Sequence, residues 1–133
     1  MTKALINGRL FDGDTILNGK AVLVDDGFVR EICESADVPN DCDRIDLNRQ
    51  LLVPGFVDIQ VNGGGGIMVD GNTTVDSLTA LAKAHRRFGT TAMLPTLITD
   101  DLTAMQTTAE AIRSAIVQNM PGIVGIHFEG PLL

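Results

Sequence analysis

The strongest constraint on the fold is an alternation of apolar runs and helical patterns in the second half of the chain. Short apolar runs at 56–61, 90–98 and 123–128 are separated by one helical pattern at 73–88 and another that opens at 99–101. A strand-helix-strand-helix-strand order predicts a parallel sheet with right-handed crossovers. An open doubly wound sheet and a (β/α)₈ barrel are both compatible with this order. Three strands and two helices complete neither fold.

Both helical patterns have an apolar face and recognisable ends. Thr73 and Asp76 predict a capping box for the first helix, and Gly89 stands where a helix C-terminus favours glycine. Acidic residues at 100–101 suit the first turn of the second helix. The side chains expected on the buried faces recur at helical spacing: Leu78, Leu81, Ala82, His85 and Phe88 in the first helix, and Leu102, Met105, Ala109, Ile112 and Ile116 in the second.

Residues 3–50 show no helical period and are predicted to form short strands. The pair Asp26-Gly27 lies between two β-rich runs, which is a strong signal for a tight hairpin. Turn residues recur about every ten positions, so we expect a small antiparallel β-unit. The pattern changes to strand and helix at Pro54-Gly55.

Composition excludes several classes of function. The chain has 10 Lys+Arg against 17 Asp+Glu, a formal net charge of −7, and no basic stripe, which argues against nucleic-acid binding and against a membrane-surface helix. No apolar run approaches the roughly 20 residues of a membrane span, and the N-terminus lacks the apolar core of a signal peptide. Cys33 and Cys42 fit no redox or metal motif and are expected to be reduced. We therefore expect a soluble cytoplasmic protein.

Polar side chains occur at the carboxyl ends of all three predicted strands. In parallel sheets and barrels, these ends meet at the edge where active sites form. Side chains alternate along a strand, so those two positions apart share a face. The polar residues at the strand ends are Asp58, Gln60 and Asn62, then Thr96 and Thr99, then His127 and Glu129.

Glu129 is the candidate with the clearest chemical requirement. An ionised carboxylate at the end of a buried strand needs a compensating partner, because its burial alone costs several kcal/mol. A metal ion, a cationic group or the backbone amides of a neighbouring loop would each serve. His127 is either a site residue or a hydrogen-bonded core residue, and His85 is expected to pack against the sheet. Two histidines cannot complete a zinc site of three or four ligands, so further ligands must come from elsewhere.

The four glycines Gly63, Gly64, Gly65 and Gly66 leave three interpretations open. A phosphate-binding loop would need the lysine and the Ser/Thr that are missing here. Glycine also permits the backbone to pass close to a ligand or to another loop, and a plain flexible turn is the third interpretation. No Ser-His-Asp or Cys-His arrangement is visible in the sequence.

Three motifs in order, PGFVDIQVNGGGG, LPTLIT and GIHFEGPLL, resemble the N-terminal third of the N-acetylglucosamine-6-phosphate deacetylase family of the amidohydrolase superfamily. INGRLFDG and DDGFVREI agree with the same family. The resemblance implies an incomplete β-sandwich at 1–53. It also implies that 54–133 form the first three strands and two helices of an incomplete (β/α)₈ barrel. A chain of this length is then the N-terminal portion of a larger enzyme, and we expect it to be inactive alone.

The resemblance also assigns roles to residues. In the superfamily the first barrel strand usually ends in His-x-His, which binds a metal; Gln60 and Asn62 stand at those positions, so the second-metal position is left vacant. One divalent metal ion, zinc or iron, is then held by Glu129 and by two histidines beyond Leu133, where the acid/base aspartate is also expected. His127 would support the metal ligands without binding the metal itself. Gly63 to Gly66 would form a loop at the mouth of the site.

The implied function is metal-dependent hydrolysis of the N-acetyl group of N-acetylglucosamine 6-phosphate, which yields glucosamine 6-phosphate and acetate in amino-sugar recycling. The partner is a phosphorylated amino sugar, and the enzyme is expected to be a homo-oligomer. Two alternatives stay open. One is another amidohydrolase, dihydroorotase-like or acting on N-acyl amino acids, which Gln60 and Asn62 disfavour. The other is a truncated module without catalytic activity.

Overall fold

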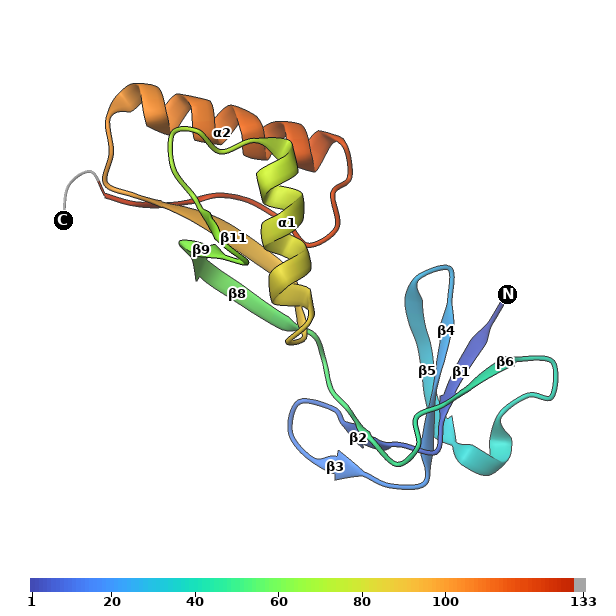
Figure 1. The fold of residues 1–133 in the computed structure, drawn as a ribbon. Helices are drawn as coiled ribbons and strands as arrows, with labels where there is room; N and C mark the ends of the chain where they lie inside the picture. Colours follow the sequence, from blue (N-terminus) through green and yellow to red (C-terminus); the bar gives the residue numbers. More distant parts are fainter. Residues whose placement is uncertain (131–133) are drawn as a thin grey trace. The chain divides into compact units, whose positions relative to one another are not determined.

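The computed structural model describes residues 1–130, so the last three residues of the GIHFEGPLL motif lie outside it. The chain divides into two compact units, Met1–Pro54 and a second unit that begins at Gly55 (Figure 1). The first unit is built from strands with one short 3-10 helix, and the second unit holds both α-helices. None of the helices within residues 1–130 is long and apolar enough to cross a lipid bilayer.

The first unit contains two small sheets (Figure 1). The larger has the strand order β5-β4-β1-β6 and the smaller has the order β3-β2-β7. The strands are β1 (Lys3–Ile6), β2 (Arg9–Phe11), β3 (Ile16–Leu17), β4 (Lys20–Asp25), β5 (Phe28–Glu34), β6 (Asp43–Asp46) and β7 (Leu51–Leu52), and the 3-10 helix η1 spans Ser35–Asp37.

The expected hairpin joins β4 to β5. Its two turn residues, Asp26 and Gly27, have φ values of 50° and 80°. This left-handed pair is the turn that matches the twist of neighbouring strands. The expectation of a purely antiparallel unit is wrong, because β1 pairs with β6 and β2 pairs with β7 in parallel. Alternating apolar residues reveal a strand but not its direction, and only tight turns enforce an antiparallel partner.

The core of the first unit is small. It contains Ala4, Ala21, Leu23 and Val38, with Cys33 and Cys42 packed against it. Both cysteines are free and partly buried. This agrees with the expectation that they are not a disulfide pair.

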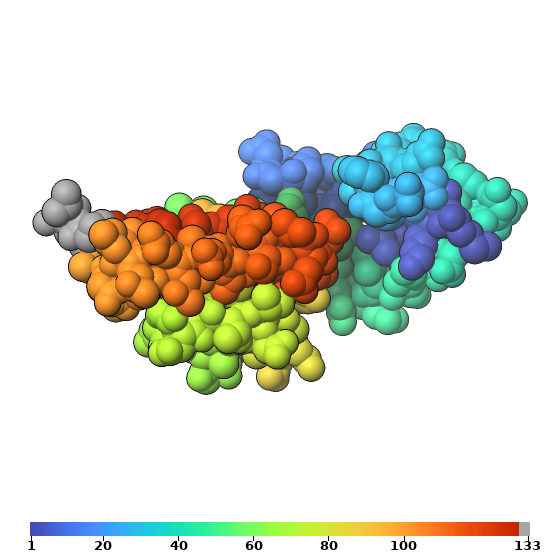
Figure 2. Space-filling model, turned by 90° about the horizontal axis from the view of Figure 1, so that it is seen from above, coloured from blue at the N-terminus to red at the C-terminus, as the bar shows by residue number. Residues whose placement is uncertain are grey.

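The second unit is a three-stranded sheet with the order β12-β11-β8, and both pairings are parallel. The strands are β8 (Phe56–Val61), β11 (Thr90–Ile98) and β12 (His127–Glu129), and the connecting helices are α1 (Val75–Arg86) and α2 (Leu102–Val117). Both helices pack on β11 and contact each other. Figure 2 shows α2, in orange to red, beside α1, in yellow-green. The predicted parallel strand-helix order is therefore confirmed.

Three boundaries differ from expectation. Helix α2 begins at Leu102 with Asp101 as its N-cap, so the acidic residues 100–101 precede its first turn. The N-cap of α1 is Thr74, which forms the capping box with Ser77. Thr73 is buried instead, and its hydroxyl accepts a hydrogen bond from the Asp70 amide at 3.0 Å. Consecutive threonines satisfy the same capping pattern, so tertiary burial decides which one caps. The third strand is also shorter than predicted, and Ile123 makes only an isolated bridge to Met93.

The buried faces of the helices match the predicted stripes only in part. Leu78, Leu81 and Ala82 are buried in α1 as expected, whereas Phe88 lies beyond the helix end and is 79% exposed. In α2 the buried side chains are Thr108, Ile112 and Ala115. Leu102, predicted on this face, is 73% exposed. The Thr108 hydroxyl donates to the Asp70 carbonyl at 2.9 Å, which lets a polar residue occupy a buried position.

The four glycines form a hairpin that packs against α1. Gly63–Gly64 is β9 and pairs with β10 (Ile67–Met68), and Gly65 and Gly66 turn between them with φ values of 61° and 83°. A Cβ on Gly64 would lie 2.5 Å from Nε2 of His85, and one on Gly65 would lie 2.8 Å from Cβ of Ala84. The backbone therefore comes close to another part of the chain, as glycine permits, but this part is helix α1 rather than the ligand or loop that was expected.

Candidate functional site

Glu129, at the end of β12, lies within hydrogen-bond reach of two amide side chains from β8. Its Oε2 accepts from Gln60 Nε2 at 2.9 Å and from Asn62 Nδ2 at 3.4 Å. The residues are 69 and 67 positions apart in the chain. They come together because β8 and β12 flank β11 in parallel and end at the same edge of the sheet. The structure thus brings three of the predicted site residues into one cluster.

The Glu129 carboxylate has a kind of partner that the sequence did not indicate. Its two donors are side-chain amides rather than backbone amides or a cationic group. Hydrogen bonds to an ionised acceptor are stronger than those between neutral groups, so two amide donors offset part of the cost of removing the carboxylate from water. Gln60 and Asn62 therefore hold and orient Glu129.

Thr96 ties the three strands together just behind this cluster. Pro95, which has no N–H, lies in the central strand β11, and the register with β8 shifts between Met93 and Pro95. At this irregularity the Val61 amide donates to Thr96 Oγ1 at 3.0 Å. The same oxygen lies 3.1 Å from the Leu94 carbonyl oxygen. Val61 is the residue between Gln60 and Asn62, so this hydroxyl holds the segment that carries both amides.

The other predicted residues lie around the cluster. His127 is half-buried, and its Nδ1 is 3.3 Å from Thr96 Oγ1, the oxygen that accepts from the Val61 amide. The Asp58 carboxylate accepts from the backbone amide of Gln60 at 3.2 Å. The Thr99 hydroxyl donates to the backbone carbonyl of Glu129 at 3.2 Å. His85, expected to pack against the sheet, contacts the glycine hairpin, where its Nε2 is 3.1 Å from the carbonyl oxygen of Gly63 in β9.

The sequence places Thr96 among the polar residues at the strand ends and does not reveal it as a structural link. Its side chain is fully buried. A proline inside an apolar strand was the available signal, because a missing backbone donor must change the ladder nearby and a neighbouring hydroxyl can replace the lost bond.

Replacing Thr96 with valine is expected to destabilise the second unit by about 1–3 kcal/mol, because the nearly isosteric side chain leaves the buried Val61 amide without its acceptor. Urea unfolding followed by circular dichroism measures the change. Thr96→Ser keeps the hydroxyl and should recover most of the loss, and Thr107→Val, at an exposed position on α2, is the matched control. Equal stability of Thr96→Val and the parent chain would contradict this role for the hydroxyl.

The Glu129 carboxylate is suited to be one ligand of a metal site. Oε2 of the Glu129 carboxylate accepts both hydrogen bonds from the side-chain amides of Gln60 and Asn62. Carboxylate oxygen is a common ligand for zinc, iron and other divalent ions. Within residues 1–130, no three side chains of His, Cys, Asp or Glu are grouped closely enough to hold a metal alone. Glu129 therefore suits the role of a single ligand that shares a metal with groups from elsewhere.

Comparison with known proteins agrees with the geometry. A family model described as the NagA composite domain matches residues 4–52. An N-acetylgalactosamine-6-phosphate deacetylase of Shewanella sp. (strain ANA-3) is 49% identical over 115 residues, which cover 85% of this chain and 29% of that protein. An N-acetylglucosamine-6-phosphate deacetylase of Haemophilus influenzae is 29% identical over 133 residues, which cover 100% of this chain and 35% of that protein.

A solved structure has the same fold over the whole chain. The N-acetylglucosamine-6-phosphate deacetylase of Pasteurella multocida superposes with a TM-score of 0.94 at 34% identity, and the match covers 100% of this chain and 35% of that one. The chain thus spans about a third of the length of the relatives that it matches. In sequence and in fold, the chain is similar to the N-terminal portion of the N-acetylglucosamine-6-phosphate deacetylases, as its motifs predicted.

Proposed function

We propose that this chain contributes part of the active site of a deacetylase that hydrolyses N-acetylglucosamine 6-phosphate to glucosamine 6-phosphate and acetate. The observation that carries the proposal is the Glu129 carboxylate, held by Gln60 and Asn62 at the carboxyl edge of a parallel sheet. The names of the relatives support the reaction. A Mycobacterium smegmatis relative, similar with a TM-score of 0.81 at 26% identity, is described in complex with N-acetylglucosamine 6-phosphate.

Glu129 is the residue in this chain that would hold a divalent metal ion, and we propose zinc or iron. Such an ion, when bound, polarises the acyl oxygen and lowers the pKa of a coordinated water molecule. Gln60 and Asn62 would keep the carboxylate in one orientation through their N–H groups, as residues behind metal ligands commonly do. His127 would not bind the metal and would support the site through its contact with Thr96. The proton-transferring aspartate and the remaining ligands are proposed to lie in sequence that follows Leu133.

We propose a β-sandwich for the first region, 1–53, and the start of a (β/α)₈ barrel for 54–133. Three large apolar side chains of β8 are exposed: Phe56, Val57 and Ile59 are 58%, 65% and 68% exposed. Their exposure supports the proposal that the barrel has more strands than β8, β11 and β12. Large apolar side chains at neighbouring strand positions normally face a further layer. The glycine hairpin is proposed to border the mouth of the site. The complete enzyme is proposed to be a cytoplasmic homo-oligomer in amino-sugar recycling.

A second candidate substrate is N-acetylgalactosamine 6-phosphate. The observation in its favour is the identity of 49% to the Shewanella N-acetylgalactosamine-6-phosphate deacetylase, against 29% to the Haemophilus enzyme. The two sugars differ only in the configuration at C4, so both use the same amide chemistry. The choice between them depends on groups around the sugar ring.

The protein encoded by the full reading frame that contains this sequence is expected to release acetate from at least one of the two hexosamine phosphates. The ratio of kcat/KM for the two sugars decides between them, and a chelator should abolish the activity. Fructose 6-phosphate, which has no N-acetyl group, serves as the blank. Absence of acetate release from both sugars, with metal supplied, would overturn the proposed function.

Residues 1–133 alone are expected to show no deacetylase activity. The reason is that no group of three potential metal ligands occurs within the described part of the chain, where Glu129 stands as a single ligand. The same acetate assay, run with added zinc or iron on the isolated chain, measures this. Metal-dependent turnover by the isolated chain would show that it holds a complete site.

A further inference from the structure

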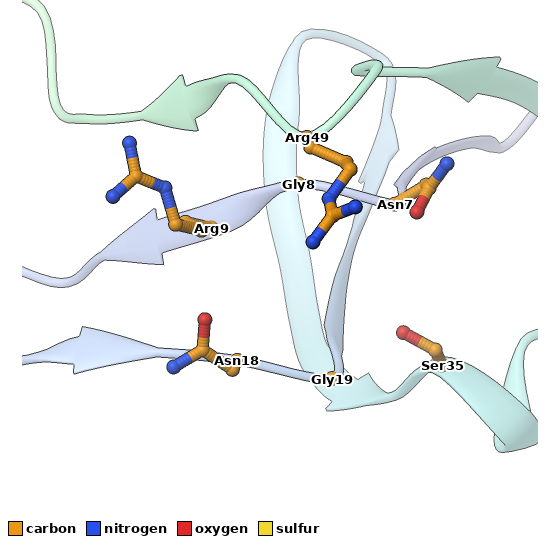
Figure 3. Close-up of a pocket in the computed structure, with 7 residues that line it drawn as sticks. All are labelled: Asn7, Gly8, Arg9, Asn18, Gly19, Ser35 and Arg49. Atoms are coloured by element: carbon orange, nitrogen blue, oxygen red, sulfur yellow. The ribbon is translucent and has the colours of Figure 1, made fainter.

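The first unit contains a polar cavity that the proposed deacetylase reaction does not use. Its volume is about 360 Å³. It lies between the start of β2, the connection from β3 to β4, and the turn before β7 (Figure 3). The residues that line it are Asn7, Gly8, Arg9, Asn18, Gly19, Ser35 and Arg49.

The charge of this cavity is opposite to that of the chain. Its lining has two guanidinium groups and no carboxylate, whereas the chain has a net charge of −7. The ion pairs within residues 1–130 involve the N-terminus, Lys20 and Arg30, so neither Arg9 nor Arg49 is paired with a carboxylate there. Their fork-shaped donors are therefore available to a ligand.

Two acidic groups close in sequence to the lining are already engaged. Glu34, which precedes Ser35, is paired with Lys20. The Asp46 carboxylate accepts from Asn7 Nδ2 at 3.0 Å and from the Asn48 amide at 2.7 Å. Hydrogen bonds hold both carboxylates on partners other than Arg9 and Arg49.

A tight turn holds Arg49 at the cavity. Arg49 has a φ of 63°, and the turn closes with the Gln50 amide donating to the Leu47 carbonyl at 2.8 Å. The Arg49 amide donates to the Asn7 carbonyl at 2.7 Å, which ties the turn to the end of β1. Figure 3 shows the side chains of Arg49 and Ser35 pointing into the space between these segments. Arg9 and Asn18 lie on neighbouring strands at one side of that space, and the Arg9 guanidinium is turned away from Asn18.

We propose that this cavity binds a small tetrahedral oxyanion of the phosphate class. Arg49 supplies a guanidinium, which matches two phosphate oxygens with two parallel N–H donors. Ser35 supplies a hydroxyl donor, and Arg9 with Asn18 supplies a second charge and an amide donor at the cavity edge. The volume falls within the range of ordinary small-molecule sites, about 300–1,000 Å³. The proposal is independent of the deacetylase reaction.

The test is a titration of the ¹⁵N-labelled 133-residue chain with inorganic phosphate at constant ionic strength, with chloride as the balancing anion. Saturable shifts are expected for the amides of Gly8, Gly19, Ser35 and Arg49. Arg49→Gln should weaken binding about tenfold or more, as expected for loss of a charge-assisted pair. Arg49→Lys, which keeps the charge but not the fork, should give an intermediate loss.

Arg113→Gln is the matched control, because it removes the same charge from an exposed position on α2. It should leave phosphate affinity within about twofold of the parent chain, since Arg113 does not line the cavity. The spectrum of each variant without phosphate checks that the chain is folded. Linear shifts without saturation, or equal losses for Arg49→Gln and Arg113→Gln, would overturn the proposal.

Discussion

Glu129→Gln in the full reading-frame protein is expected to lower turnover by about 100-fold or more and to reduce the bound metal in parallel. The substitution keeps the length of the side chain and retains a carbonyl oxygen that can accept from Gln60. It removes the negative charge that a divalent cation requires from this ligand. The loss should therefore fall on metal binding and catalysis rather than on folding.

The control for this variant is Glu110→Gln, at an exposed position on α2. It makes the same chemical change and should keep full activity and full metal content. Metal content by elemental analysis, kcat by acetate release and the unfolding midpoint are measured on the same samples. If Glu129→Gln keeps both its metal and its turnover, Glu129 is not a metal ligand. If both are lost together with the fold, Glu129→Asp separates the two effects, because it retains the charge.

Ile112→Ala is expected to destabilise the second unit by about 2–5 kcal/mol, whereas Leu102→Ala on the same helix should cost less than about 0.5 kcal/mol. Both changes remove the same number of carbon atoms from residues that the sequence placed on one apolar stripe. Ile112 is 1% exposed in the core, and Leu102 is 73% exposed. Loss of a buried side chain leaves a cavity, and loss of an exposed one does not.

The measurement is urea unfolding of the 133-residue chain. The sequence contains no Trp or Tyr, so helical circular dichroism is the natural signal, and it reports on the second unit, which holds α1 and α2. The slope of the transition should stay constant across the variants if only stability changes. Equal losses for Ile112→Ala and Leu102→Ala would mean that the predicted stripe, rather than the described packing, defines the buried face of α2.

Much of the second unit follows from local pattern. Two helical periods between three apolar runs leave little choice but a parallel sheet, because right-handed crossovers place successive strands side by side in one direction. The same argument predicts that Gln60, Asn62 and Glu129 lie at one edge. The hydrogen bonds from both amides to Glu129 agree with that prediction.

The first unit was harder to predict, because its strands are short and their partners are distant. Alternation identified the β4–β5 hairpin, where Asp26 and Gly27 dictate a tight turn. It could not show that β6 runs parallel to β1, since this pairing closes a long connection. The polar cavity of this unit could not be predicted for the same reason. Its lining residues Arg9, Ser35 and Arg49 come together only when the strands are paired.

The sequence by itself determined the order and type of the main elements of the second unit, the edge where its polar groups gather, and the resemblance to a deacetylase family. Only the tertiary structure decided which threonine caps α1, which face of α2 is buried, and what holds Glu129. The physical reason is the separation along the chain of the residues that interact. Periodicity and capping act over a few residues, whereas the contact of Gln60 with Glu129 depends on strand pairing across β11, where the register with β8 shifts between Met93 and Pro95.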